Sequence, residues 1–364
     1  MRRTRRVWPA ASCTLILALV VLQAACTPAK TPAESPPPGE KPGESVAQLP
    51  EVPLGLPPVP VPADNPMTPE KVKLGKLLYF DKRVSQDGTI SCATCHDPQM
   101  AWAEHEPTST GIKDAHGEPQ MGGRNSPTVI NAAYATSQFW DGREPDLEAQ
   151  AIGPVGNPIE MGHTMEAVVE VFAKIPGYER LFQEAFGSGV TEKGFAQAIA
   201  AFERTVLSGN SPYDQFKAGD DAALDDVQKE GLALFTESCA NCHTPPLFSN
   251  YRFYNAGVGM DKEDPDKGRM AVTDDPRHMG AFRVPALREV ANTAPYFHDG
   301  SVPTLEEAVA LMAGGGKDNA NLSAFLKSVR EAELTEEDQA KIVEFLKALS
   351  GEFPKIAPPE KFPQ

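Results

Sequence analysis

Two copies of the pentapeptide Cys-x-x-Cys-His constrain this chain more than any other feature. They lie at residues 92–96 and 239–243. A single copy would also suit a zinc knuckle or a redox dithiol. Two complete copies instead favour covalent haem, because the thiols of this motif add to the haem vinyl groups and its histidine binds the iron. The sequence therefore predicts two c-type haems, held by Cys92, Cys95 and His96 and by Cys239, Cys242 and His243.

The N-terminus is typical of an export signal. Several arginines precede an apolar run over residues 10–21, which is too short for a comfortable membrane span, and Cys26 follows two alanines. We therefore expect residues 1–26 to direct export to the periplasm, with Cys26 as the acceptor of a lipid anchor. The alternative is ordinary cleavage near Ala25, which would release a soluble periplasmic protein. Cys13 and Cys26 are the only cysteines outside the two motifs, so no disulfide framework is expected.

Residues 27–62 are dominated by proline together with Glu, Gly, Ser and Ala. Such a composition offers too little apolar surface to compensate the entropy of ordering. We predict a disordered tether that holds the body of the protein away from a membrane. The alternative is a disordered segment with no spacing role.

The remaining chain is long enough for two domains. His96 and His243 are separated by 147 positions, which gives each motif about one domain length of chain. We expect domains at 63–215 and 216–364. The formal net charge of −16 argues against nucleic acid as a partner. It suits a basic electron-transfer partner, or simply keeps the protein soluble.

Apolar spacing predicts a mainly helical protein. One helix is expected after Thr335, with Asp338 in a capping box and a stop at Gly351, and a second after Thr304. A third carries an apolar stripe from Phe195 to Val206. Two stretches, 107–131 and 250–303, are rich in Gly and Pro and predict long loops around the haems.

Three further stretches carry a resemblance to a known family. They read GGRNSPTV at 122–129, QFWDGR at 138–143 and TAPYFHDG at 293–300. Together with the two motifs they resemble the bacterial di-haem cytochrome c peroxidases, a family that includes the di-haem enzyme of methylamine utilisation. The resemblance extends from about residue 66 to residue 349.

This resemblance implies a mainly α fold of two cytochrome c-like haem domains packed face to face, with long haem-wrapping loops. The N-terminal haem would bind hydrogen peroxide and the C-terminal haem would accept electrons. Trp140 matches the tryptophan between the haems, Glu160 the acid of the peroxide site, and Gln150 and Pro154 its pocket neighbours. A carboxylate is suited to moving a proton between the two peroxide oxygens.

Met312 matches the sixth ligand of the second haem, where the methylamine enzyme has tyrosine. A thioether ligand raises the reduction potential, which suits a haem that receives electrons. Met312 could instead pack in the core with Leu305 and Val309. Met260, Met270 and Met279 are rival ligands.

The N-terminal haem departs from many peroxidases of the family. These carry a distal histidine in a loop where this sequence has Ile112, which cannot bind iron. We therefore expect an open first haem, although His105 or His116 could substitute after a shift of register.

The family also implies calcium between the domains, bound by Asn125 and by the carbonyls of Thr293 and Pro295, and a homodimer. Oxygen ligands of this kind suit calcium. The predicted function is reduction of hydrogen peroxide to water, with electrons from a cytochrome c or a cupredoxin. The alternatives are peroxide-dependent oxidation of a protein side chain, as in the methylamine enzyme, and a non-enzymatic di-haem electron carrier.

Overall fold

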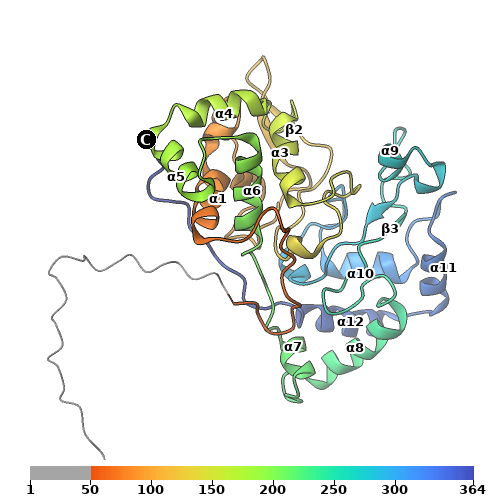
Figure 1. The fold of residues 1–364 in the computed structure, drawn as a ribbon. Coiled ribbons are helices and arrows are strands. Elements are labelled where there is room, and N and C mark those ends of the chain that lie inside the picture. The colour runs from red at the N-terminus through yellow and green to blue at the C-terminus, as the bar shows by residue number, and fades with distance from the viewer. Residues whose placement is uncertain (1–50) are drawn as a thin grey trace, which may run out of the picture. The chain divides into compact units, whose positions relative to one another are not determined.

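The computed structural model describes residues 51–364 (Figure 1). The predicted export segment with Cys26, and residues 27–50 of the predicted tether, lie outside the described residues. Within the described part, helices dominate and strands occur only as two short hairpin-like pairs, so the prediction of a mainly α protein is confirmed. None of the helices described is long and apolar enough to cross a membrane.

The first half of the described chain builds one group of helices. They are α1 (Pro69–Phe80), α2 (Cys92–Cys95), α3 (Leu147–Gly156), α4 (Met165–Ala173), α5 (Pro176–Phe186) and α6 (Glu192–Glu203). Strands β1 (Thr110–Lys113) and β2 (Pro119–Met121) form an antiparallel pair within the predicted loop 107–131.

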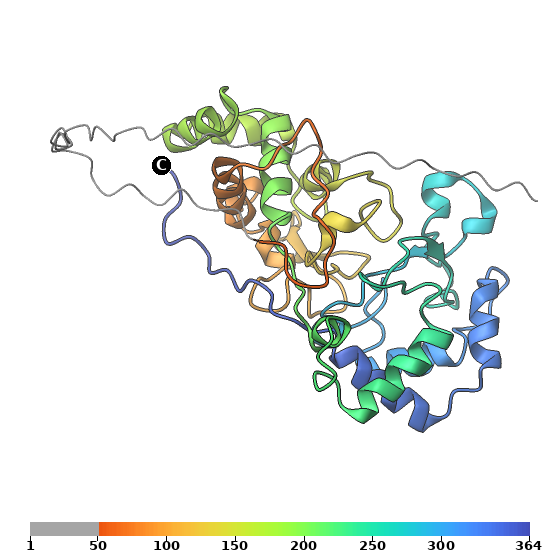
Figure 2. The ribbon, with the colours of Figure 1, turned by 60° about the horizontal axis from the view of Figure 1, so that its bottom comes forward.

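The second half builds another group of helices, shown in green to blue in Figures 1 and 2. They are α7 (Pro212–Lys217), α8 (Asp226–Ser238), α9 (Met270–Thr273), α10 (Leu305–Ala313), α11 (Ala324–Glu331) and α12 (Glu336–Lys347). The predicted loop 250–303 contains only α9, short 3-10 turns and the paired strands β3 (Phe253–Tyr254) and β4 (Phe282–Arg283).

The helix starts predicted from caps are confirmed, but two helices end earlier than predicted, α12 at Lys347 instead of at Gly351 and α6 at Glu203 instead of at Val206. Thr335 caps α12 and forms the expected capping box with Asp338. Thr304 caps α10, where its hydroxyl accepts from the backbone N–H of Glu307. The apolar stripe that begins at Phe195 lies on α6, which ends at Glu203.

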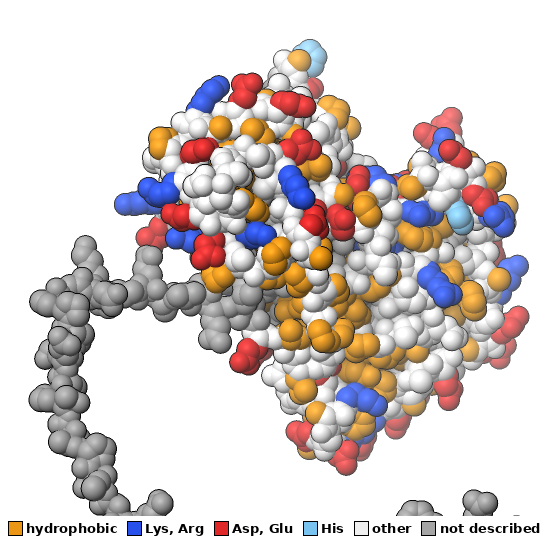
Figure 3. Space-filling model, viewed as in Figure 1, with side chains coloured by type: hydrophobic (Ala, Val, Ile, Leu, Met, Phe, Trp, Pro, Cys, Tyr) orange, Lys and Arg blue, Asp and Glu red, His pale blue; other side chains and the backbone are white. Residues whose placement is uncertain are grey.

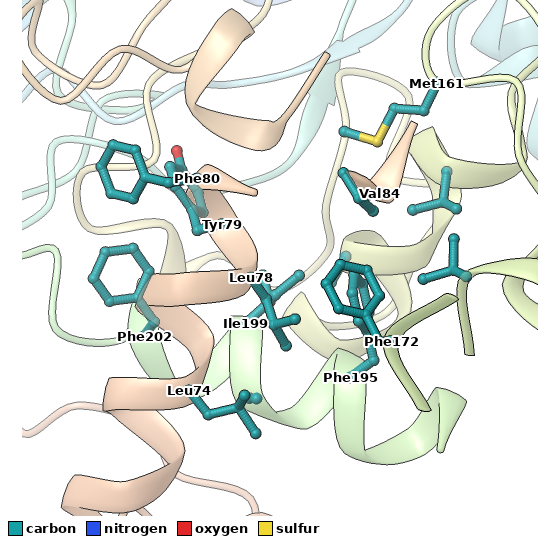
Figure 4. Packing of buried hydrophobic residues seen from close by; sticks show 14 of the residues in the cluster. Leu74, Leu78, Tyr79, Phe80, Val84, Met161, Phe172, Phe195, Ile199 and Phe202 are labelled. Atoms are coloured by element: carbon teal, nitrogen blue, oxygen red, sulfur yellow. The ribbon is translucent and has the colours of Figure 1, made fainter. Parts of the chain in front are cut away.

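Each half has its own hydrophobic core. The first core gathers large aromatic and aliphatic side chains of α1, α4, α5 and α6, among them Leu74, Tyr79, Phe172, Phe195 and Phe202 (Figure 4). The second core gathers Phe235, Phe248, Phe345 and their aliphatic neighbours from α8, α10 and α12.

The same close helix crossing occurs once in each half. A β-carbon built on Gly75 of α1 would lie 1.9 Å from the carbonyl oxygen of Ala198 on α6. One built on Gly231 of α8 would lie 2.0 Å from the carbonyl oxygen of Lys341 on α12. Only glycine fits at such contacts. In both halves, therefore, a helix that precedes a haem motif is held against a later helix through backbone contact.

Two terminal segments bind the halves together. In the arm at 51–62, which the sequence analysis assigned to the disordered tether, Gly55 and Pro57 accept hydrogen bonds from Arg288 and Tyr134. Leu56 and Val59 also pack on apolar neighbours and are partly buried. This part of the predicted tether is therefore held on the body of the protein by these contacts and hydrogen bonds.

The C-terminal tail after α12 returns to the first half. Phe353, Ile356 and Phe362 pack against the first core, and the indole of buried Trp102 donates to the carbonyl of Pro354 at 2.8 Å. The end of the chain, marked C in Figure 1, lies beside α5, where the backbone N–H of Gly177 donates to Gln364.

Candidate active site

The first motif is folded as one helical turn. Ser91 precedes α2, and its backbone N–H donates to the hydroxyl of Thr94, a residue inside the motif. The turn places Cys92 and Cys95 three residues apart and therefore on one side. Both thiols are free, and burial raises the pKa of Cys95 to about 12, so this thiol is protonated at neutral pH.

A cavity of about 490 Å³ opens beside this turn. Its size is in the range of ligand pockets. The cavity brings together the residues predicted to bind the first haem and to form its peroxide site, which are Cys92, Cys95, His96, Gln150, Pro154 and Glu160. It is also lined by Trp140, predicted to lie between the haems, and by Asn125, predicted as a calcium ligand.

His96 has the properties of a metal ligand. Burial of the ring lowers its pKa to about 4, so the imidazole is neutral and retains a lone pair at physiological pH. Its Nδ1 atom is buried and has no hydrogen-bond partner. Two thiols on one side of a turn, a neutral histidine and an adjoining cavity form a donor set that fits a c-type haem.

Glu160 reaches the cavity from the segment that follows α3. The helix places Gln150 and Pro154 four residues apart on the cavity side, while Leu147, Ala151 and Val155 are buried. The side-chain amide of Asn157 then donates to Glu160 Oε1 at 2.9 Å. Burial raises the pKa of the Glu160 carboxyl above its ordinary value, although Arg143 and Asn157 act against this shift.

The loop that could have supplied a distal histidine runs past Glu160 without one. The backbone N–H of Ile112 donates to the carbonyl of Glu160 at 2.9 Å, and the Ile112 side chain is buried in the first core. Gly111 approaches so closely that a β-carbon would lie 1.8 Å from the carbonyl oxygen of Ile159. His105 and His116 are both exposed, and neither lines the cavity.

The second motif follows α8 directly. Cys239 caps that helix, and the Nδ1 of His243 lies 3.0 Å from the carbonyl of Phe248. Because a carbonyl only accepts, Nδ1 carries the hydrogen and Nε2 keeps its lone pair for a metal. Burial lowers the pKa of His243 to about 4, so this ring is also neutral.

Met312 lies on α10 and is only half-buried. It is not among the residues packed on the second core, although Leu305 and Val309 of the same helix are. The alternative that Met312 packs in this core with them is therefore not supported. Of the rival ligands, Met260 lies beside Gly280, Met270 begins α9, and Met279 accepts a hydrogen bond from Asn255 through its carbonyl.

The residues predicted to bind calcium are spread over two loops. The buried Asn125 donates through its side chain to the carbonyl of Glu106 and through its backbone N–H to the carbonyl of His298. Thr293 and Pro295 lie five and three residues before that histidine. Among the described residues, no group of three or more His, Cys, Asp or Glu side chains is arranged to hold a metal ion. That finding does not bear on a site built from carbonyl and amide oxygens.

The cavity residues that sequence reasoning missed include Glu203, Tyr251 and Arg283. Glu203 ends α6, and burial raises its pKa to about 8. A glutamate within the apolar stripe from Phe195 to Val206 was the available signal for it. No sequence signal pointed to Tyr251 or Arg283, which reach the cavity from the second half of the chain.

Comparison with known proteins identifies similar chains. Residues 69–222 match the family model "Di-haem cytochrome c peroxidase", and residues 281–311 match "RoxA-like, cytochrome c-like". The chain is 38% identical to the methylamine utilization protein MauG of Methylorubrum extorquens, over 83% of this chain and 84% of that protein. It is 40% identical to the cytochrome c551 peroxidase of Pseudomonas aeruginosa, over 81% and 83% of the two chains.

A solved structure described as a MauG-like protein associated with microbial copper homeostasis superposes with a TM-score of 0.74 at 32% identity. The match covers 83% of this chain and 95% of that chain.

Proposed function

Because this chain belongs to the di-haem cytochrome c peroxidase family, we propose that the cavity at its first motif is the place where it reduces hydrogen peroxide. The enzyme acts on peroxide and carries two c-type haems, as its membership of the family implies. One observation carries the assignment of the site. A half-buried carboxyl, that of Glu160, lines the same cavity as the neutral imidazole of His96 and the two thiols.

When bound, the haem supplies the iron at which the peroxide O–O bond is cleaved. Glu160 moves the proton that this cleavage requires, since one peroxide oxygen must lose a proton and the other must gain one. A raised pKa brings the carboxyl closer to neutral pH, where it can both accept and donate. Asn157 holds the carboxyl in place, and Gln150 and Pro154 shape the cavity wall beside it.

The first site is open to peroxide. The Ile112 side chain lies in the first core, and the exposed His105 and His116 lie outside the cavity wall. Neither histidine near this loop therefore lies at the cavity. The enzyme should react without prior reduction.

Electrons enter through the second motif and reach the first by way of Trp140. Met312 is the proposed second ligand of the haem at the second motif. The two haem domains, 63–215 and 216–364, would face each other across Trp140. The indole is held in place because it donates to the carbonyl of Asn125 at 2.8 Å. The donor is a small cytochrome c or cupredoxin. On the face shown in Figure 3, acidic and basic side chains are interspersed around a band of hydrophobic ones, so charge alone does not mark a docking site there.

The remaining proposals extend the family resemblance. Calcium would bind Asn125 and the carbonyls of Thr293 and Pro295. The protein would act in the periplasm as a homodimer, anchored through a lipid on Cys26.

A second candidate is oxidation of a protein side chain, since the chain is as similar to MauG proteins as to named peroxidases. Met312, where the methylamine enzyme has tyrosine, favours the peroxidase. Steady turnover of peroxide with a reduced small redox protein would support reduction to water. Peroxide consumption that requires a protein substrate would support the second candidate.

The substitution Glu160→Gln tests the site. The amide keeps the shape of the side chain and can still accept from Asn157, but it cannot shuttle a proton. We expect kcat/KM for peroxide to fall by roughly 10²–10⁴-fold while both haems stay bound. The control is Glu166→Gln, an exposed glutamate on α4. Equal activity in both variants would show that Glu160 is not the proton carrier.

Electron paramagnetic resonance of the oxidised protein tests the open site separately. A high-spin signal that reacts at once with peroxide is expected. Two low-spin signals that react only after partial reduction would show that a histidine gates the first haem.

A further inference from the structure

Three arginines line the cavity at the first motif, and one of them lacks a counter-ion. Arg124 pairs with Asp141 and Asp266 at 2.7 Å, and Arg143 pairs with Asp141 at 3.1 Å. Arg283, on β4, has no carboxylate within 4 Å anywhere in residues 51–364. Its Nε donates only to the carbonyl of Phe139, at 3.3 Å.

An unpaired guanidinium in such a place is energetically unfavourable. Burial lowers the pKa of Arg283, which shows that the surroundings disfavour its charge. Arginine nevertheless keeps its proton. The free-energy penalty of burying its charge is therefore offset only if an anion binds close to it. The two terminal nitrogens of Arg283 have no partner in the described chain, and they form the planar fork that binds a carboxylate with two hydrogen bonds.

A second unpartnered donor lies beside it. Tyr251 also lines the cavity, and the Arg283 guanidinium lies 5.7 Å from the centre of its ring. The Tyr251 hydroxyl is buried and has no hydrogen-bond partner. Burial raises its pKa to about 12, so the hydroxyl stays protonated and can donate. The hydroxyl is covered by protein atoms and does not itself reach the cavity, so the Arg283 fork is the donor that lacks an acceptor there.

The place is close to both haem motifs. The backbone N–H of Arg283 donates to the carbonyl of Trp140 at 2.8 Å, and Pro285, two residues later, lies against the His243 ring. The cavity itself is bounded by Cys92, Cys95 and His96 on another side. A hydrogen-bond acceptor on a haem attached at Cys92 and Cys95 could pair with the Arg283 guanidinium. No further ligand would then be needed.

We propose that the Arg283 fork is a clamp for a carboxylate, and that this carboxylate is a propionate of the haem bound at the first motif. The inference rests on the proposed haem site but not on peroxide turnover. The clamp fixes the haem edge that faces Trp140 and keeps its propionate ionised. Arg283 thereby raises the reduction potential of that haem, because a nearby positive charge favours the ferrous state.

The test is a redox titration of each haem in the full-length, haem-loaded protein over a range of pH. It is made in a Glu160→Gln, Glu203→Gln background, because both carboxyls line the same cavity and burial raises their pKa values. In this background the clamp holds the propionate ionised, and the potential of the first haem stays flat around neutral pH. In Arg283→Gln, the potential should fall, by roughly tenfold in the ferric–ferrous equilibrium constant. It should also become pH-dependent, since a buried carboxylate without its cation binds a proton near neutral pH. Tyr251→Phe, which keeps the ring beside Arg283, should leave the potential independent of pH.

Arg143→Gln is the matched control. It removes a cation from the same cavity wall, but that cation already has Asp141 as its partner. It should shift the potential without making it pH-dependent. If Arg283 acted only through its charge or through packing, both variants would show the same pH-independent shift in the potential of the first haem. That result would overturn the proposal.

Two further arms complete the test. If Arg283→Gln does not retain haem, Arg283→Lys, which keeps the charge but loses the fork, should give an intermediate pH dependence. Acetate added to the wild type should leave both potentials unchanged. An acetate-dependent shift that Arg283→Gln abolishes would show that the clamp binds a soluble anion instead, and would overturn the assignment to a propionate.

Discussion

The buried ion pair between Arg288 and Asp214 should be essential to the stability of this protein. The two side chains are 1% and 2% exposed, and the guanidinium makes two hydrogen bonds of 2.8 Å to the carboxylate. Arg288 also donates to the carbonyls of Gly55 and Pro246. It thus ties the N-terminal arm and helix α7 to the loop that follows the second motif.

Replacing Arg288 by Met removes the cation but leaves the buried carboxylate. Breaking a buried pair in this way costs about 3–5 kcal/mol. For a chain of this size the loss corresponds to a fall of roughly 6–10 °C in the midpoint of thermal unfolding. Circular dichroism of the haem-loaded protein measures that midpoint. The matched control is Arg277→Met, because Arg277 is exposed and pairs with Asp275 at the surface. It should leave the midpoint unchanged.

The double variant Arg288→Met, Asp214→Leu sharpens the test. It leaves no buried charge, so it should recover most of the lost stability. The pair also predicts a pH effect. Burial opposes ionisation of Asp214, but the hydrogen bonds from Arg288 outweigh it and hold its pKa below the ordinary value. The stability from this group is therefore present above the ordinary pKa and is lost as the pH falls through the lowered one. Equal midpoints for Arg288→Met and Arg277→Met would refute the reasoning.

Three further predictions concern the two haem sites. Gly111→Ala should lower the free energy of unfolding by about 1–3 kcal/mol, since a β-carbon has no room there. Gly123→Ala, with nothing within 4 Å of its β-carbon, should be neutral. Urea unfolding of the two variants measures the difference. Met312→Ala should lower the reduction potential of the second haem and make it high-spin, while Met260→Ala should not, as redox titration and electron paramagnetic resonance will show. Burial raises the pKa of Glu203 to about 8, so its contribution to stability is full below its ordinary pKa and is lost as the pH rises through about 8. Glu203→Gln should therefore remove this pH dependence from the free energy of unfolding. An unchanged dependence would contradict the prediction.

Local signals in the sequence predicted much of this architecture. Capping residues such as Thr335 and Thr304 located helix starts, because a cap is a contact between residues three positions apart. The two motifs predicted the places of the haems for the same reason. Family resemblance then named Glu160, Gln150 and Trp140, which the structure brings to one cavity wall.

Long-range contacts were not predictable in this way. Arg283 and Tyr251 reach the first cavity from the second half of the chain, more than 150 residues from His96. Nothing in their local sequence distinguishes them from an ordinary arginine and tyrosine. Composition also misled at 51–62, because a few apolar residues among many prolines were enough to anchor that arm.

The return of the C-terminal tail has a consequence for the order in which the protein matures. The first motif lies in the first third of the chain, but the core behind it is closed by Phe353, Ile356 and Phe362 at the very end. The half that holds the first motif therefore cannot complete its packing until residues 353–362 have docked. Until then, Cys92 and Cys95 lie in a half whose core is still incomplete.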